Sequence, residues 1–377
     1  MKSLILSYKH LEVKVKMKIT ILGSGNGGTT VAADMALMGH EVSLFDFAEF
    51  PTNIEAINRK GGIETIGKIN GFAKLAYAGN DVEKAIDGAE MILAVGPAYS
   101  TASFAKAVKP YLKKNQIVCV CPSSGAGAII FKEALGLDLN DEEYIVCETS
   151  TLPYATRLDE PGKVNVYHKL TGGVYLATIP AKESQKAYEK FKKLYPYVTK
   201  AKSLLMTMLQ TGNNIIHPSI SLLNASRIES TQGDFGFYED GATPAAGKLM
   251  KAIDDEKMKL SAKLDIGLIR DPEVKLLQEY NVDATYENGY RTAPGFKGIK
   301  AQSKLDNRYF NEDVGYGLVF ISELSKQVEV ETPIIDAIIL IVSKIMERDY
   351  RAEGKLTPKV LGLDQYSTNA LKELFCQ

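Results

Sequence analysis

Three glycines and one acidic residue near the start of the chain have the types and spacing suited to binding a dinucleotide. Gly23, Gly25 and Gly28 follow the G-x-G-x-x-G pattern, and Asp46 comes roughly 20 residues later. The glycines permit a tight turn, close approach of backbone to a pyrophosphate and close packing of a helix on a strand. The N–H groups that open the helix, including that of Asn26, would hold the pyrophosphate because the helix dipole favours anions there. Asp46 would accept hydrogen bonds from ribose hydroxyls and repel a 2′-phosphate, so we expect NAD (as NADH) and disfavour NADP.

The segments around these glycines alternate as strand, turn, helix and strand. Residues 19–22 predict a buried strand, residues 31–38 an apolar helix, and residues 42–45 a second strand that ends at Asp46. A glycine triplet alone is weak evidence, and a coincidental Gly-rich turn is the alternative. Because strand, triplet, helix, second strand and acid come in register, we predict a dinucleotide-binding unit.

The chain has only four histidines, so few side chains can exchange a proton near neutral pH. His10 lies close to the N-terminus, His40 in a helix-to-strand turn of the nucleotide-binding unit, and His168 at the end of a strand. His217 lies in an apolar helical stretch interrupted by Pro218, which predicts a kink or a helix start at this point. From the residues alone, a hydrogen-bonded core histidine and a catalytic histidine are equally good interpretations.

A second polar cluster, residues 307–318, ends a long loop and begins an apolar helix. Arg308 and Asp313 are its candidate functional residues. A helix cap or a first-turn acid explains Asp313 without any chemistry, and a solvent-exposed charge explains Arg308. The local pattern does not choose between these structural roles and functional ones.

Composition limits the class of protein. The chain has 377 residues, which is enough for two domains with separate cores. Its 45 basic and 46 acidic residues nearly cancel, so we expect no binding of nucleic acid or of an anionic membrane. The four cysteines form no C-x-x-C pair, which favours reduced thiols over disulfides or a metal site.

The ends of the chain and its most apolar run bear on localisation. Residues 1–16 do not resemble a convincing signal peptide, and we interpret them as a leader extension outside the fold. The apolar run at residues 333–345 is too short to span a bilayer. We therefore expect a cytoplasmic protein. The sequence leaves the oligomeric state open, a homodimer included.

The pattern of predicted secondary structure changes near residue 200. Strand-like and helix-like segments alternate over residues 17–199, which predicts an α/β fold with a doubly wound parallel sheet of the Rossmann type. Helical periods dominate residues 203–377 and predict an all-α domain, crossed by a long loop at residues 286–311. Substrate is expected in the crevice between the two domains.

Four segments, in order, resemble the opine dehydrogenase family, which includes the octopine and nopaline dehydrogenases. They are the GSGNGG opening, STLPYATR at residues 150–157, NNIIHP, and RYFNEDV. The resemblance covers nearly the whole chain from Met17. It implies a Rossmann domain, an all-α domain, and reductive condensation of an α-keto acid, such as pyruvate, with the amino group of an amino acid by NADH or NADPH.

The resemblance also implies roles for individual residues. His217 matches the catalytic histidine, Asp313 its paired acid, Arg308 the carboxylate-binding arginine, and Thr151 a substrate-side position. His217 would exchange a proton at the reacting centre, Asp313 would fix its tautomer, and Arg308 would hold a carboxylate through two parallel hydrogen bonds.

Two alternatives stay open beside this function. One is a 2-keto-acid or ketopantoate-type reductase, which typically relies on a lysine in the helical domain. The other is a non-catalytic NAD-binding sensor. The identities of the amino acid and the keto acid are not determined by these motifs.

Overall fold

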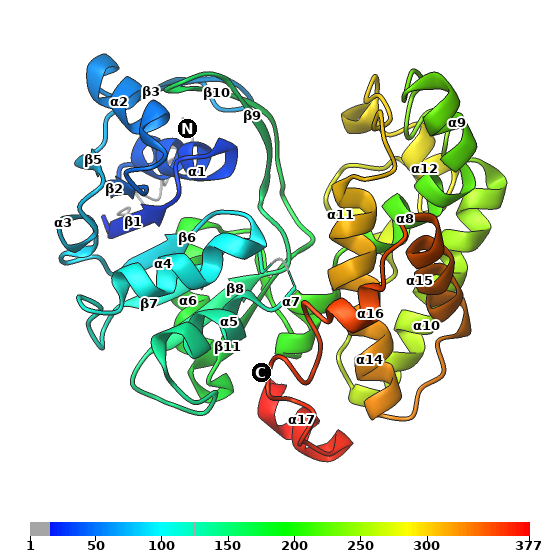
Figure 1. Ribbon diagram of the computed structural model, residues 1–377. Coiled ribbons are helices and arrows are strands. Elements are labelled where there is room, and N and C mark those ends of the chain that lie inside the picture. Colours follow the sequence, from blue (N-terminus) through cyan, green and yellow to red (C-terminus); the bar gives the residue numbers. More distant parts are fainter. Residues whose placement is uncertain (1–15, 124) are drawn as a thin grey trace, which may run out of the picture.

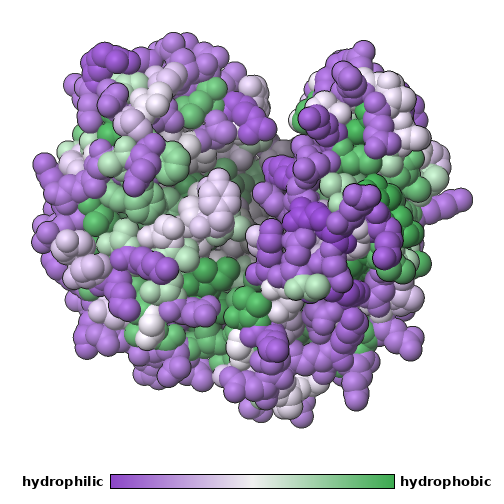
Figure 2. Space-filling model, viewed as in Figure 1, coloured by the Kyte–Doolittle hydropathy of each residue, from purple (hydrophilic) through white to green (hydrophobic). Residues whose placement is uncertain are grey.

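The computed structural model describes residues 16–123 and 125–377. The predicted leader, residues 1–16, lies outside the described residues except for Lys16. The chain forms a sheet-containing part followed by a helical part, arranged side by side (Figure 1). A groove separates the two parts on the surface (Figure 2).

An eight-stranded sheet forms the centre of the first part, with strand order β12-β11-β8-β7-β6-β1-β2-β5. Every neighbouring pair in it is parallel except β8 with β11. This arrangement confirms the predicted Rossmann-type sheet. Its strands are β1 (Lys18–Leu22), β2 (Glu41–Phe45), β5 (Tyr77–Gly79), β6 (Met91–Ala94), β7 (Ile117–Val120), β8 (Ile145–Thr149), β11 (Val174–Ile179) and β12 (Val198–Lys200).

Helices cover both faces of this sheet. Successive residues of β6 show this, because Ile92 belongs to the apolar core that includes Phe104 and Phe131, whereas Leu93 belongs to the core that includes Val31 and Phe191. Strands buried on both faces are apolar throughout, as β6 and β7 are. The helical segments of this part are α1 (Asn26–Leu37), α2 (Pro51–Lys60), α3 (Val82–Ile86), η1 (Ala98–Ser100), α4 (Thr101–Val108), α5 (Gly127–Leu135), η2 (Ala181–Glu183) and α6 (Ser184–Leu194).

A second, four-stranded sheet of order β4-β3-β10-β9 packs against α1. It contains β3 (Ile63–Gly67), β4 (Gly71–Ala73), β9 (Tyr154–Glu160) and β10 (Lys163–Lys169). Thr156 of β9 bonds to Thr30 of α1 at 2.7 Å between hydroxyl oxygens, and Lys169 of β10 pairs with Asp34 of α1 at 2.6 Å. The long strands β9 and β10 run along the side of the sheet part that faces the helical part (Figure 1).

The second part is built from helices, as predicted. They are α7 (Leu204–Leu209), α8 (Asn213–Leu223), α9 (Ala225–Thr231), α10 (Pro244–Leu264), α11 (Asp271–Leu277), α12 (Asn288–Arg291), η3 (Pro294–Phe296), α13 (Arg308–Asn311), the π-helical segment η4 (Asp313–Leu318), α14 (Val319–Gln327), α15 (Pro333–Ile345), α16 (Tyr350–Glu353) and α17 (Thr368–Phe375). Among the described residues, none of the helices has the length and apolar character needed to traverse a bilayer.

The sequence predicted a kink or a helix start at His217, and the helix start is wrong. Helix α8 begins at Asn213 and continues through Pro218. A proline this close to the N-terminus removes a single helical hydrogen bond, that to the carbonyl of Asn214, so the remaining apolar packing keeps the helix intact. The break instead comes at Asn224, between α8 and α9.

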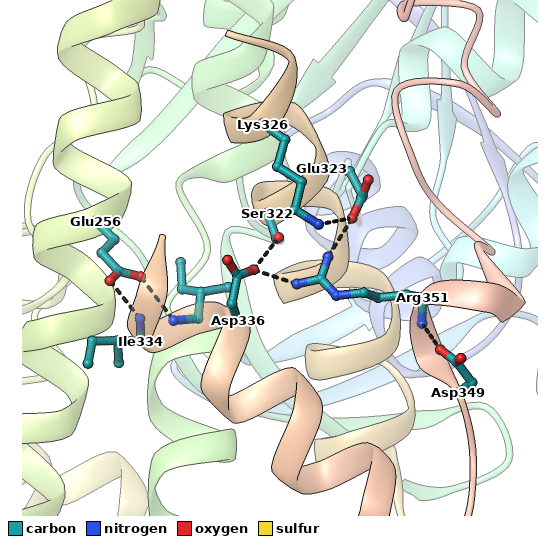
Figure 3. Close-up of polar contacts among 9 residues, drawn as sticks. Glu256, Ser322, Glu323, Lys326, Ile334, Asp336, Asp349 and Arg351 are labelled. Atoms are coloured by element: carbon teal, nitrogen blue, oxygen red, sulfur yellow. Dashed lines mark hydrogen bonds and ion pairs between the residues drawn. The ribbon is translucent and has the colours of Figure 1, made fainter. Parts of the chain in front are cut away.

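Ion pairs and hydrogen bonds join the helices around the segment that carries Asp313. Arg351 of α16 bonds to Glu323 of α14 and to Asp336 of α15 (Figure 3). Glu256 of α10 accepts the two N–H groups near the start of α15 at 2.8 and 2.9 Å. Because α14 continues directly from η4, these contacts join the helix that follows Asp313 to α15 and α16.

Polar contacts also connect the two parts of the molecule. The side chain of Gln377 exchanges two hydrogen bonds with the backbone of Thr178 in β11, at 2.7 and 2.9 Å. Gln278, which follows α11, makes two further contacts. Its backbone carbonyl lies 2.9 Å from Nε2 of His168, and the side-chain amide of Gln278 donates to the carbonyl of Gly173 at 2.9 Å. The groove therefore lies between parts whose orientation is tied by contacts far apart in sequence.

Candidate active site

His217 and Asp313 are in direct contact although 96 residues separate them in sequence. Nδ1 of His217 lies 2.7 Å from Oδ2 of Asp313, and each side chain is less than a tenth exposed. When the imidazole is neutral, the carboxylate accepts the Nδ1–H and leaves the lone pair of Nε2 to accept a proton. This is the arrangement of a histidine oriented by an acid for proton transfer.

Glycines allow the segment that carries Asp313 to approach its neighbours closely. A Cβ atom on Gly317 would stand 3.0 Å from Cβ of Asn214 in α8, and one on Gly315 would stand 2.8 Å from the ring of Tyr350. A side chain on Gly317 would push η4 away from α8, and one on Gly315 would collide with Tyr350 of α16. The small residues therefore permit the short distance between Asp313 and the histidine.

Two tyrosines that the sequence analysis did not single out surround the imidazole. The hydroxyl of Tyr238 lies 3.0 Å from Nε2 of His217, and the ring of Tyr309 stacks on the imidazole with 3.9 Å between centroids. Burial raises the pKa of the Tyr238 phenol far above its usual value, and Tyr309 and Asp313 raise it further. Tyr309 directly follows Arg308, so its place in the sequence could have identified it as a site residue. No feature of the sequence around Tyr238 pointed to a site.

Arg308 is the first residue of α13 and directly precedes Tyr309. Its guanidinium is about half exposed and pairs only loosely with Glu312, at 3.3 Å between Nε and Oε2. Its positive charge lowers the pKa of the phenols of Tyr309 and Tyr238, against the opposing effect of their burial. Arg308 therefore lies beside the His217 cluster with its guanidinium open to solvent, where it can take a carboxylate.

A second arginine approaches this cluster from the sheet part. This residue is Arg157 of β9. The neighbouring Thr156 contacts α1, so the alternation of side chains along a strand directs Arg157 to the opposite face of β9. Arg157 is exposed on that face, and its charge lowers the pKa of Tyr309 in the helical part. Within residues 16–123 and 125–377, the exposed guanidinium of Arg157 has no ion-pair or hydrogen-bond partner.

The three glycines of the predicted cofactor motif have different roles. Gly23 has a left-handed φ of 105°, and a Cβ there would collide with the carbonyl oxygen of Val95. A Cβ on Gly28 would collide with the carbonyl oxygen of Gly23, so Gly28 lets α1 pack on the turn. A Cβ on Gly25, at the N-cap of α1, would meet nothing within 4 Å. The middle glycine therefore presents open backbone, as an approaching pyrophosphate requires.

Asp46 lies in the same cleft, at the end of β2. Its Oδ2 accepts hydrogen bonds from the backbone N–H and the hydroxyl of Ser24, both at 2.6 Å, and its Oδ1 accepts the N–H of Phe47 at 2.9 Å. These bonds orient a carboxylate that still has lone pairs for ribose hydroxyls. The cleft has a volume of about 780 Å³ and is lined by residues that include Gly23, Ser24, Gly25, Asp46, Phe47, Phe50, Asn53, Val95, Gly96, Tyr99 and Phe104. Gly25 and Asp46, the residues predicted to lie at the pyrophosphate and at the ribose, therefore line one cleft.

Asn26 and Thr151 are two further site residues predicted from the sequence. The side-chain oxygen of Asn26 accepts the N–H of Leu158 at 2.7 Å, which leaves its backbone N–H and its side-chain N–H groups as donors. Thr151 is half-buried, and its neighbour Leu152 packs against the glycine turn, 3.0 Å from where a Cβ of Gly27 would stand. Within the part of the chain that the structure describes, no hydrogen bond joins Thr151 to the His217 cluster.

Comparison with known proteins gives matches to both parts of the chain. Residues 200–346 match the family model for the alpha-helical domain of NAD/NADP octopine/nopaline dehydrogenases, and residues 18–124 match that for the N-terminus of NAD-dependent glycerol-3-phosphate dehydrogenase. An opine dehydrogenase from Arthrobacter sp. (strain 1C) is 33% identical over 344 residues, which cover 91% of this chain and 94% of the relative. The chain belongs to the opine dehydrogenase family.

Octopine dehydrogenases are among the more distant relatives of this chain. The octopine dehydrogenase of Pecten maximus is 24% identical and covers 91% of this chain and 94% of its own length. A solved octopine dehydrogenase structure with NADH and L-arginine has a TM-score of 0.74 at 19% identity, over 95% of this chain and 98% of that one. The predicted fold and family are confirmed, and the protein is an NAD-dependent oxidoreductase.

Proposed function

We propose that this opine dehydrogenase uses NADH to condense an α-keto acid, such as pyruvate, with the amino group of an amino acid. The observation that carries the proposal is the contact between His217 and Asp313 beside the open guanidinium of Arg308. Solved octopine dehydrogenases described with NADH and L-arginine, and with NADH and pyruvate, support these two substrate classes.

In this proposal His217 and Asp313 handle the protons of imine formation. The amino acid enters as an ammonium ion and must lose a proton before its nitrogen attacks the carbonyl carbon. Neutral His217 accepts that proton, and Asp313 stabilises the resulting imidazolium. The imidazolium then returns the proton to the hydroxyl that leaves as water. Bound NADH supplies the hydride that reduces the iminium carbon.

The arginines would bind the carboxylates. The product of such a condensation carries two carboxylates, one from each substrate, joined through a secondary amine. Arg308 holds the carboxylate of the keto acid from the helical part, and Arg157 holds that of the amino acid from the opposite wall. Thr151, next to the glycine turn, contributes a hydroxyl on the substrate side. Charge-assisted pairs of this kind orient both reactants.

Within this assignment the cofactor belongs to the sheet part and the substrates to the helical part. Gly23, Gly25 and Gly28 form the turn under the pyrophosphate, the backbone N–H of Asn26 adds a donor at the start of α1, and Asp46 takes the ribose. The corresponding division of the chain is residues 17–199 for the cofactor domain and residues 203–377 for the substrate domain.

A ketopantoate-type reductase fits the helical part less well. That class relies on a lysine, and Lys257 of α10 packs next to α8. Its ammonium is buried and donates to the carbonyl of Thr211 at 3.0 Å and to the side-chain oxygen of Asn214 at 3.4 Å. These bonds give Lys257 a structural role at the start of α8.

The decisive assay follows NADH oxidation with pyruvate across a panel of amino acids. We expect oxidation only when both substrates are present. Oxidation with the keto acid alone, at a rate independent of the amine, would reassign the protein to the simple reductases. Tight binding of NADH without turnover on any pair would favour the non-catalytic sensor.

A further inference from the structure

Protein groups occupy both ring nitrogens of His217. Asp313 takes Nδ1 at 2.7 Å, and the hydroxyl of Tyr238 takes Nε2 at 3.0 Å. The ring of Tyr309 covers one face of the imidazole, stacked at 3.9 Å, and the ring of Phe237 lies at 6.0 Å between centroids. Both nitrogens of the imidazole are therefore bonded to protein groups, and the group at Nε2 is a hydroxyl that can itself donate or accept a proton.

We propose that Tyr238 is a further catalytic residue, whose hydroxyl passes a proton between Nε2 of His217 and the reacting amine. This inference rests on the function proposed above and adds to it the group that touches the substrate nitrogen.

The Tyr238 ring is held firmly for this role. It stacks on Phe296 with 4.2 Å between centroids and a 14° angle, and it meets Phe237 edge-on at 5.0 Å. The backbone N–H of Phe237 donates to the carbonyl of Ile299 at 2.8 Å, which ties this segment to the long loop. These contacts leave the hydroxyl little freedom except rotation of its hydrogen.

The hydroxyl lies at Nε2 of His217, the ring nitrogen that does not contact Asp313. The positive charge of Arg308 lowers the pKa of Tyr238, which puts the phenol within the electrostatic reach of the proposed carboxylate-binding residue. The ring of Tyr309 stacks on His217 at 3.9 Å, and the positive charge of Arg157 lowers the pKa of Tyr309. The hydroxyl thus contacts His217 and is reached by the charge of Arg308, the residue proposed to orient the keto acid.

A tyrosine hydroxyl both donates and accepts, so it can carry a proton in either direction. As the ammonium gives a proton to the Tyr238 oxygen, the original phenolic hydrogen moves to Nε2 of His217. One N–H and one O–H bond break, one O–H and one N–H bond form, and the tyrosine is unchanged. Burial raises the pKa of the phenol, so the two transfers occur together without a free tyrosinate. The reverse transfer delivers the proton to the departing hydroxyl.

The test is Tyr238→Phe, which keeps the ring and removes the hydroxyl. Tyr280→Phe is the matched control, because Tyr280 stacks on the same Phe296 at 5.8 Å and has no contact with His217. We expect kcat of Tyr238→Phe to fall at least about tenfold, with unchanged affinity for NADH. The solvent deuterium isotope effect on kcat should rise, because proton transfer becomes rate-limiting. The control should match the wild-type enzyme in both quantities.

Several results would overturn the relay. They are a wild-type kcat and isotope effect in Tyr238→Phe, a change confined to KM, or an equal loss of kcat in the control. If Tyr238→Phe does not fold, 3,5-difluorotyrosine at position 238 preserves the shape and lowers the phenol pKa, and an unchanged kcat would then contradict the proposal. Wild-type turnover that needs no amine would instead refute the proposed function.

Discussion

Oδ2 of Asp313 lies 2.7 Å from Nδ1 of His217, so the first residue of η4 sets the orientation of a side chain from the middle of α8. The contact fixes which nitrogen of the imidazole carries the proton and which one faces Tyr238. The proposed chemistry depends on this pair.

Removal of the imidazole should therefore abolish most of the activity. We expect His217→Gln to lower kcat by about 10²- to 10⁴-fold, the usual contribution of general acid–base catalysis. Binding of NADH, measured by fluorescence titration, should stay unchanged because the cofactor cleft lies in the sheet part. His168→Gln is the control, since His168 contacts Gln278 between the two parts and not the site. A kcat within twofold of wild type in His217→Gln would refute the acid–base role.

The two arginines should affect the two substrates separately. We expect Arg308→Gln to raise KM for the keto acid and Arg157→Gln to raise KM for the amino acid, each by about 10- to 100-fold, because each loses a charge-assisted bond. Initial-rate measurements with each substrate varied in turn distinguish them. Arg59→Gln, on the exposed end of α2, should change neither value. Equal effects of Arg157→Gln and Arg59→Gln would remove Arg157 from the site.

Alanine substitutions in the glycine turn should separate cofactor binding from folding. Gly25→Ala adds a methyl group into open space, so the melting temperature should hold while NADH affinity falls at least about tenfold. Gly28→Ala drives a methyl group into the carbonyl of Gly23 and should lower the free energy of unfolding by about 3 kcal/mol or more. Calorimetry and NADH titration measure the two effects. Unaltered NADH binding in Gly25→Ala would place the pyrophosphate elsewhere.

Stability should also depend on pH through a buried lysine. Lys132 of α5 is fully buried and donates to the carbonyls of Leu139 and Asp141, and burial lowers its pKa to about 8. Between pH 8 and the unfolded-state pKa of about 10.4, the unfolded chain binds more protons than the native one, so this lysine makes stability rise with pH. Denaturant titrations at pH 7 and pH 10 give the free energy of unfolding of wild type and of Lys132→Met. We expect the wild-type value minus the Lys132→Met value to be larger at pH 10 than at pH 7. A difference independent of pH would contradict the lowered pKa.

Local sequence patterns predicted the parts of the fold that local interactions determine. The glycine turn, β1 and β2 follow directly from apolar periods and turn residues, since those signals lie within short windows. The start of α8 was misplaced because Pro218 is tolerated inside that helix, where apolar packing outweighs one lost hydrogen bond.

The site was predictable only in part. Family motifs pointed to His217, Asp313 and Arg308, but the 2.7 Å contact depends on helix packing that no local window contains. The motifs assigned no role to Tyr238 or Arg157, because the roles proposed for them depend on tertiary contacts. The ring of Tyr238 is held against Phe296. Arg157 lies on the face of β9 that points away from α1.

Identification of the reaction product tests the central claim most directly. Purified enzyme incubated with NADH, pyruvate and the amino acid that gives the fastest NADH oxidation is analysed by mass spectrometry. We predict a single N-(1-carboxyethyl)amino acid, with the mass of both substrates minus one oxygen atom, formed in equal amount to the NADH consumed. Lactate as the product, with the amino acid recovered intact, would contradict the account.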